Sequence, residues 1–122
     1  MENEKQFNIL EKAILNWITE NSKDPSIVAQ TKAAQFVERK RTNVGFYVKL
    51  AVPEGLGIIG SIGKKTVVNG PGIESEDIEF NGGSLIFCEK GYLDTLEIYA
   101  NGSFFKENVT NFKLQPDPNI SN

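Results

Sequence analysis

Acidic side chains gather in the second half of this 122-residue chain, where residues 74 to 97 hold seven carboxylates and one Lys. Such a density of carboxylates can attract a hard cation, supply paired acids for hydrolysis, or attract a basic partner by its charge. Tyr99 follows them and could anchor a protein contact. The candidate residues are Glu74, Glu76, Asp77, Glu79, Asp94, Glu97 and Tyr99.

A cation site and a paired-carboxylate hydrolase both fit the spacing of these acids poorly. The acids from 74 to 79 lack the alternating Asp or Asn ligands and the central Gly of a dedicated calcium loop. Asp94 and Glu97 are three residues apart, so a regular strand would place them on opposite faces, away from each other. The sequence therefore predicts no metal, no cofactor and no paired-carboxylate hydrolase.

The chain contains no histidine and a single cysteine. Without histidine it lacks the commonest general base and the partner that activates Ser and Cys nucleophiles. Cys88 lies in the apolar run Leu85–Cys88, so we expect it to be a small buried residue, and a lone cysteine rules out an internal disulfide. We therefore predict a protein that is not an enzyme.

A glycine-rich segment offers the alternative function. Gly55–Gly60 matches the G-x-G-x-x-G pattern of dinucleotide-binding proteins, but β-branched residues, Gly and Pro follow it where a helix must begin. Gly63–Thr66 resembles the end of a phosphate-binding loop without its first Gly and its last Ser or Thr. A small enzyme or an anion or nucleotide binder that uses loop 55–66, with Lys64 and Lys65 on the anion, stays open as the alternative.

Two helices are expected near the N-terminus. Apolar residues recur at spacings of three and four over residues 6–20, which predicts an amphipathic helix with Glu11 off its apolar stripe. Asp24 can cap a second helix over residues 25–33 that has Pro25 at its first position. The stripe of the first helix comprises Phe7, Leu10, Ile14, Trp17 and Ile18.

Strands are expected from residue 36 onward. Turns are predicted at the three Asn-Gly pairs, 69–70, 81–82 and 101–102, and at Glu89–Gly91. The expected strands are 36–41, 44–52, 62–68, 73–80, 84–89, 92–100 and 110–114. The residues expected beneath the helices are Phe46, Val48, Leu50, Phe87, Leu96 and Ile98.

These elements predict an α+β fold, with one or two N-terminal helices packed on a mainly antiparallel meander sheet of five to seven strands. Residues 1–114 form a single domain and residues 115–122 a flexible C-terminal tail. Glu97 lies between Leu96 and Ile98, so it shares the other sheet face with Tyr99. If that face is covered, we expect Arg39 or Arg41 to pair with Glu97.

Two segments of the chain resemble segments of a known protein family. Residues 41–50 contain Gly45-Phe46-Tyr47, and residues 82–102 contain a Gly-rich apolar strand, a turn and Leu96-Glu97-Ile98-Tyr99. From 26 to 114 the chain resembles a widespread family of small uncharacterised bacterial α+β proteins, although Asn43 stands where many members have Gly. Some members are encoded near toxin–immunity loci, so the resemblance implies an immunity role.

The function that we predict is non-catalytic protein binding, in the form of an immunity-type inhibitor of a bacterial toxin. Nuclease toxins are basic because they bind phosphates, and an acidic sheet face can imitate that charge. The net charge of −3 and the acidic second half predict no binding to nucleic acid. No apolar run could cross a membrane and no signal peptide precedes the domain, so we expect a cytoplasmic protein. A homodimer through edge strands is a further alternative.

Overall fold

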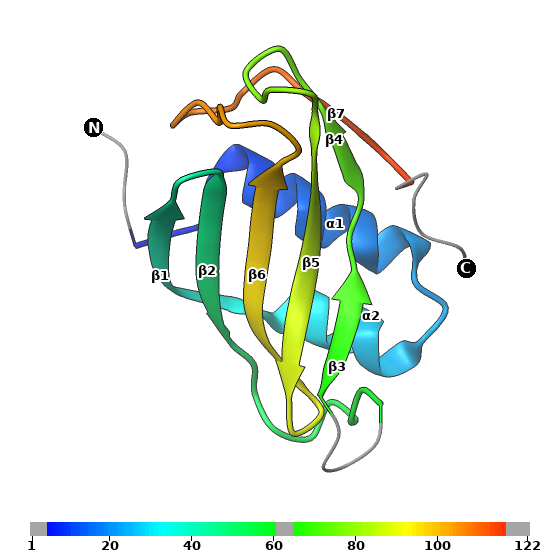
Figure 1. Ribbon diagram of the computed structural model, residues 1–122. Helices are drawn as coiled ribbons and strands as arrows, with labels where there is room; N and C mark the ends of the chain where they lie inside the picture. Colours follow the sequence, from blue (N-terminus) through cyan, green and yellow to red (C-terminus); the bar gives the residue numbers. More distant parts are fainter. Residues whose placement is uncertain (1–4, 61–64, 117–122) are drawn as a thin grey trace.

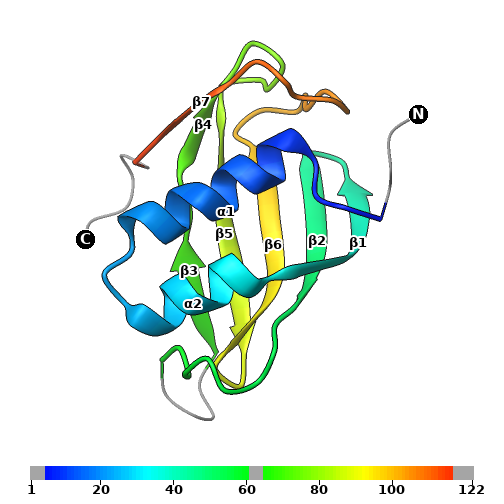
Figure 2. The same ribbon diagram turned by 180° about the vertical axis from the view of Figure 1, so that it is seen from behind.

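The structure is a computed structural model that describes residues 5–60 and 65–116. Within these residues two helices pack on one antiparallel sheet of seven strands, which confirms the predicted α+β fold with N-terminal helices. Figure 1 shows the sheet in front of the helices, and Figure 2 shows the helices in front of the sheet. The elements are α1 (Ile9–Asn21), α2 (Pro25–Ala33), β1 (Gln35–Thr42), β2 (Gly45–Ala51), β3 (Thr66–Asn69), β4 (Gly72–Glu74), β5 (Gly82–Glu89), β6 (Tyr92–Ala100) and β7 (Lys113–Gln115).

The strand order departs from a simple meander at three pairings, β2–β6, β3–β5 and β4–β7. The order is β1-β2-β6-β5-β4-β7, and β3 also pairs with β5. β2 therefore lies next to β6, and β3 and β4 share β5 as a partner. β7 includes Gln115, so the predicted tail begins inside a strand, and residues 117–122 lie outside the described residues. No described helix has the length and apolar character that a membrane span needs.

The turn predictions have mixed outcomes. The β5–β6 hairpin turns at Lys90 and Gly91, both at positive φ, as predicted. Asn69-Gly70 is not a hairpin turn, because it separates β3 from β4 and both pair with β5. The turn at Asn81 lies one residue earlier than predicted, with Phe80 and Asn81 at φ 57° and 60°. Most of the predicted strand 73–80 is therefore a loop, which the Ile78–Phe105 bridge and backbone hydrogen bonds such as that from the Glu79 N–H to the Phe104 carbonyl join to the segment after β6.

The core lies between α1 and the inner face of the sheet. The two predicted helices form, and Asp24 caps α2 as expected, whereas α1 begins at Ile9, later than predicted, with Asn8 as its cap. Phe87 is 40% exposed, so its predicted place in the core is wrong; Ile86 and Cys88, its neighbours in β5, are buried instead. The residues that carry most of the packing are Leu10, Ile14, Leu15, Ile18, Phe46, Val48, Leu50, Ile86, Leu96 and Ile98.

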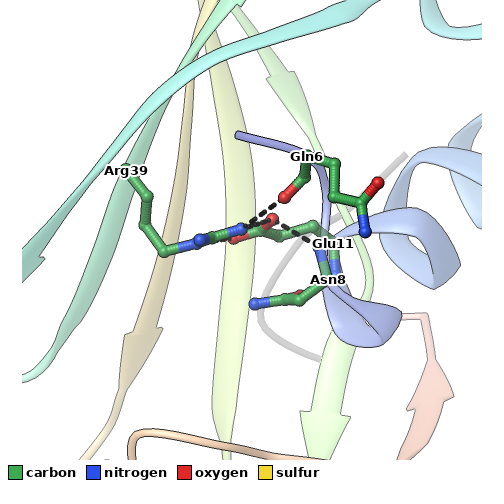
Figure 3. A network of polar contacts seen from close by, with 4 residues as sticks. All are labelled: Gln6, Asn8, Glu11 and Arg39. Atoms are coloured by element: carbon green, nitrogen blue, oxygen red, sulfur yellow. Dashed lines mark hydrogen bonds and ion pairs between the residues drawn. The ribbon is translucent and has the colours of Figure 1, made fainter. Parts of the chain in front are cut away.

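A buried ion pair joins the start of α1 to β1 (Figure 3). Glu11 has no exposed surface, so its predicted place off the buried stripe is wrong. Its carboxylate accepts hydrogen bonds from Arg39 Nε at 2.6 Å and Arg39 Nη2 at 2.5 Å, and from the Asn8 backbone N–H at 2.9 Å. Arg39 also donates to the Gln6 carbonyl. Arg39 is therefore the partner of Glu11, and Arg41 donates to the carbonyl of Phe105.

The Glu11–Arg39 pair generates a stability prediction. Arg39→Met leaves a buried carboxylate without its cation, so we expect the free energy of unfolding to fall by about 3–5 kcal/mol in urea titrations. Adding Glu11→Gln should recover part of that loss, because Gln keeps the contact to the Asn8 N–H without a buried charge. Lys40→Met is the control, since the exposed Lys40–Glu38 pair at 3.8 Å should contribute less than about 1 kcal/mol. Equal losses for the two single variants would contradict this account.

Candidate functional site

Both helices lie on one face of the sheet and leave the other face bare among the described residues (Figures 1 and 2). On this outer face the strand registers align side chains in two rows. Tyr47, Val67 and Phe87 are exposed by 40%, 45% and 40%. The first row comprises Val67, Phe87, Thr95 and Lys49, and the second comprises Asn69, Leu85, Glu97 and Tyr47.

Glu97 lies in the middle of the outer face. The Tyr47 hydroxyl donates a hydrogen bond to the Glu97 carboxylate, and this bond, the charge of Glu97 and slight burial together raise the pKa of Tyr47 above 10.0. Tyr99 shares this face, as predicted, and its ring lies across Gly83, where any Cβ would meet the ring. A carboxylate among three aromatic side chains, Tyr47, Phe87 and Tyr99, can therefore meet an incoming cation and apolar groups together.

Asp94 lies on the same face as Glu97, contrary to the prediction from their odd spacing. The β5–β6 register shifts between Phe87, which pairs with Thr95, and Cys88, which pairs with Leu93. Asp94 is the extra residue of this bulge, and a bulge reverses the alternation of side chains. Its carboxylate binds Lys49 Nζ at 2.5 Å and the Thr95 hydroxyl at 2.8 Å. Burial alone would raise the pKa of Asp94, but these hydrogen bonds and the Lys49 charge hold it below its usual value.

The acids from 74 to 79 lie elsewhere, at one end of the sheet, where Glu74 ends β4 and the others belong to the loop between β4 and β5. The Glu79 carboxylate accepts hydrogen bonds from the backbone N–H of Ser103 at 2.5 Å and from its hydroxyl at 2.9 Å, which lower the pKa of Glu79. Asp77 lies 3.7 Å from Lys106. Glu79 and Asp77 therefore hold the neighbouring loop 101–106 in place and are less available to a partner.

Glu74 and Glu76 are the exposed acids among residues 74–79. They line a cleft of about 570 Å³ together with Phe80, Phe112 and Lys113. The seven predicted site residues thus divide into two groups, since Asp94, Glu97 and Tyr99 belong to the outer face. No three or more His, Cys, Asp or Glu residues of the described ranges 5–60 and 65–116 are placed to hold a metal ion.

The glycine-rich segment is bound to its surroundings by a glutamine that sequence reasoning missed. Gln30 is fully buried in α2, and its amide donates to the carbonyls of Gly57 at 2.7 Å and Gly91 at 3.0 Å. Its carbonyl accepts the Leu93 N–H at 2.9 Å. Sequence patterns do not single Gln30 out, because it is one of several polar residues in the helix over residues 25–33. These contacts make the segment a structural connection between α2 and the β5–β6 hairpin.

The alternative function finds little support in this region. Lys65 is exposed, and Lys64 lies outside the described residues. A cavity of about 720 Å³ lies beside the segment, and its walls include the apolar side chains of Trp17, Ile27 and Val68 with Lys23 and Asp24 close together. An anion site needs converging donors, and this wall is mainly apolar.

A second cleft, of about 450 Å³, contains Lys5, Arg39 and Arg41. Arg39 is bound to Glu11 and Arg41 to the Phe105 carbonyl, so both arginines already stabilise the fold.

Comparison of the chain with protein-family models, with curated proteins and with solved structures gives no match. The candidate site therefore rests on the geometry of the outer face and of the Glu74–Glu76 cleft.

The Tyr47–Glu97 contact generates a titration prediction. Because the folded-state pKa of Tyr47 is raised, its protonated form stabilises the fold fully below pH 10, and this contribution is lost as pH rises through the folded pKa. Glu97→Gln removes the charge, so we expect the Tyr47 pKa to fall toward 10.0 in an NMR titration of ring-labelled tyrosine. Asp94→Asn, at a carboxylate held by Lys49, is the control and should change it less. An unchanged Tyr47 pKa in Glu97→Gln would contradict the contact.

Gln30 generates a second stability prediction. Gln30→Met fills a similar volume but leaves the Gly57 carbonyl and the Leu93 N–H without their partner, whereas the Gly91 carbonyl keeps the Ile59 N–H. Each buried polar group left unpaired costs about 1–3 kcal/mol, so we expect a loss of about 2–6 kcal/mol in urea titrations and faster hydrogen exchange at Leu93. Gln35→Met, at an exposed position of β1, should change stability by less than about 0.5 kcal/mol. If both substitutions behave alike, Gln30 does not hold the loop.

Proposed function

We propose that this chain is a non-catalytic protein-binding module and that its contact surface is the outer face of the sheet. The observation that carries the proposal is the exposure of Tyr47, Val67 and Phe87 on the one face that the helices leave bare. Exposed apolar side chains grouped on one face commonly mark a contact with another protein, and aromatic residues are enriched among the residues that dominate binding energy.

The charge of the outer face indicates the partner's chemistry. Lys49 is bound by Asp94, and Lys40 lies 3.8 Å from Glu38, so both lysines are matched by acids of the same face. Glu97 interacts with the neutral hydroxyl of Tyr47, so its negative charge is left for a basic partner to match. The partner in this proposal is a protein that brings a basic and apolar surface.

An immunity-type inhibitor of a basic bacterial toxin is the sharper form of the same proposal. The acidic net charge, −3, and the outer face of the sheet support it, because electrostatic steering speeds association with a basic protein.

The single cysteine supports the non-catalytic assignment. Cys88 is buried and free, with a pKa raised to about 11 by burial and by Asp94, which makes it a poor nucleophile. A free thiol also fits the cytoplasmic location that the proposal includes.

The test is binding by variants of the outer face. Phe87→Ser combined with Val67→Thr removes apolar surface at exposed positions, so the fold should keep its stability while affinity for a partner falls about tenfold or more. Phe104→Ser is the matched control, because Phe104 is 51% exposed in the loop after β6. Partners captured from the source cells and then purified would be measured by calorimetry against all three proteins.

Two binding results would overturn the proposed contact surface, and one activity result would overturn the non-catalytic assignment. One is equal affinity of the purified partner for the double variant and the wild-type protein. The other is sedimentation of the purified chain as a dimer that dissociates in the double variant, because a second copy would then occupy the face. Turnover of a small metabolite that is lost when Glu97 or Asp94 is neutralised would contradict the non-catalytic assignment.

A further inference from the structure

Phe80 is the most exposed large apolar residue of the described chain, with 77% of its surface accessible. It also has φ 57°, in the left-handed region that L-residues with bulky side chains rarely adopt. The neighbouring Asn81, at φ 60°, is a residue type that accepts this conformation readily. The turn therefore places an aromatic residue where Asn or Gly would fit with less strain and less exposed apolar surface.

Hydrogen bonds on both sides of Phe80 hold this conformation. The Phe80 carbonyl accepts the Asn101 side-chain amide at 3.3 Å, and the Asn81 side chain accepts the Ser75 N–H at 3.2 Å. The Ser75 hydroxyl donates to the Asn111 carbonyl at 2.7 Å. Backbone strain persists where surrounding contacts fix it, and such positions cluster at ligand-binding sites. The loop thus presents the Phe80 ring from a fixed backbone, which reduces the entropy that a partner's binding would cost.

Acidic side chains adjoin the ring. Glu74 and Glu76 line the same cleft of about 570 Å³, and Phe112 supplies a second aromatic wall. Lys113 lies opposite Glu74 in the β4–β7 register, whereas Glu76 is exposed. The cleft therefore offers an apolar anchor with an excess of negative charge beside it. Its chemical complement is a positively charged side chain next to an apolar one.

We propose that the cleft formed by Phe80, Phe112, Glu74 and Glu76 binds a segment of a partner protein in which an Arg or Lys adjoins an apolar side chain. This surface is separate from the outer face, and the inference does not depend on the function proposed for that face. The Phe80 ring packs against the apolar side chain, and Glu76, with Glu74, pairs with the cation. The backbone strain at Phe80 then lowers the stability of the free protein but holds the Phe80 ring exposed for binding.

A defined peptide tests the proposal. Acetyl-Leu-Arg-Leu-amide, added to the ¹⁵N-labelled protein, should shift the amide signals of residues 74–81 and 111–113 with a dissociation constant in the millimolar range. Acetyl-Leu-Gln-Leu-amide, which lacks the charge, should bind more weakly. Glu76→Gln should reduce affinity for the arginine peptide several-fold and leave the weak binding of the glutamine peptide unchanged.

Phe80→Asn separates a binding role from a structural one. Because Asn tolerates the left-handed turn, we expect the melting temperature to rise by roughly 2–5 °C while affinity for the arginine peptide falls about tenfold. Phe104→Asn is the matched control, and it should leave affinity for the peptide unchanged. Unchanged affinity in Phe80→Asn, a lower melting temperature of that variant, or wild-type signals that do not respond to the arginine peptide would each overturn the proposal. The outer-face double variant binds the peptide normally if the two surfaces are independent.

Discussion

The buried Glu11 carboxylate constrains the position of the helical layer on the sheet. It closes the N-terminal cap of α1 through Asn8 and meets the guanidinium of Arg39 from β1, so one side chain fixes both the start of the helix and its contact with the edge strand. A buried ion pair contributes little net stability compared with apolar residues of the same size, but a wrong arrangement that separates its charges is costly. The pair therefore acts mainly by excluding other placements of α1, and with α1 on the inner face the outer face stays open.

The distribution of acids shows why a count of carboxylates differs from the charge that a partner meets. Asp77 and Glu79 hold the loop after β6, and Asp94 neutralises Lys49. Glu97 and the exposed Glu76 keep more of their charge for contacts outside the chain. Each lies beside exposed aromatic surface, Phe87 for the outer face and Phe80 for the cleft. Binding energy at such sites comes from the aromatic group, and the carboxylate adds orientation and faster association.

Local patterns in the sequence predicted the helices, the Asp24 cap of α2, the alternation of β2 and the Lys90-Gly91 turn, because each depends on residues close together in the chain. The errors came from contacts between distant segments. Glu11 is buried because Arg39, 28 residues later, pairs with it. Asp94 faces the side of Glu97 because β5 and β6 form a bulge, which no alternation pattern reveals. Phe87 was expected in the core, although Ile86 and Cys88 occupy the inner face of β5.

The two proposed surfaces are linked through Tyr99 and the glycines of β5. A side chain at Gly82 would collide with the Tyr99 carbonyl, and one at Gly83 would collide with the Tyr99 ring. Both glycines are therefore needed inside the sheet, where the Tyr99 ring lies against Gly83, and Gly82 begins β5 instead of completing a turn with Asn81. The turn lies one residue earlier, with Phe80 at positive φ and its side chain exposed. The Asn-Gly pattern failed here because the close approach of β6 at Tyr99 requires Gly82 inside β5, so the strained Phe80 on one surface follows from the packing that places Tyr99 on the other.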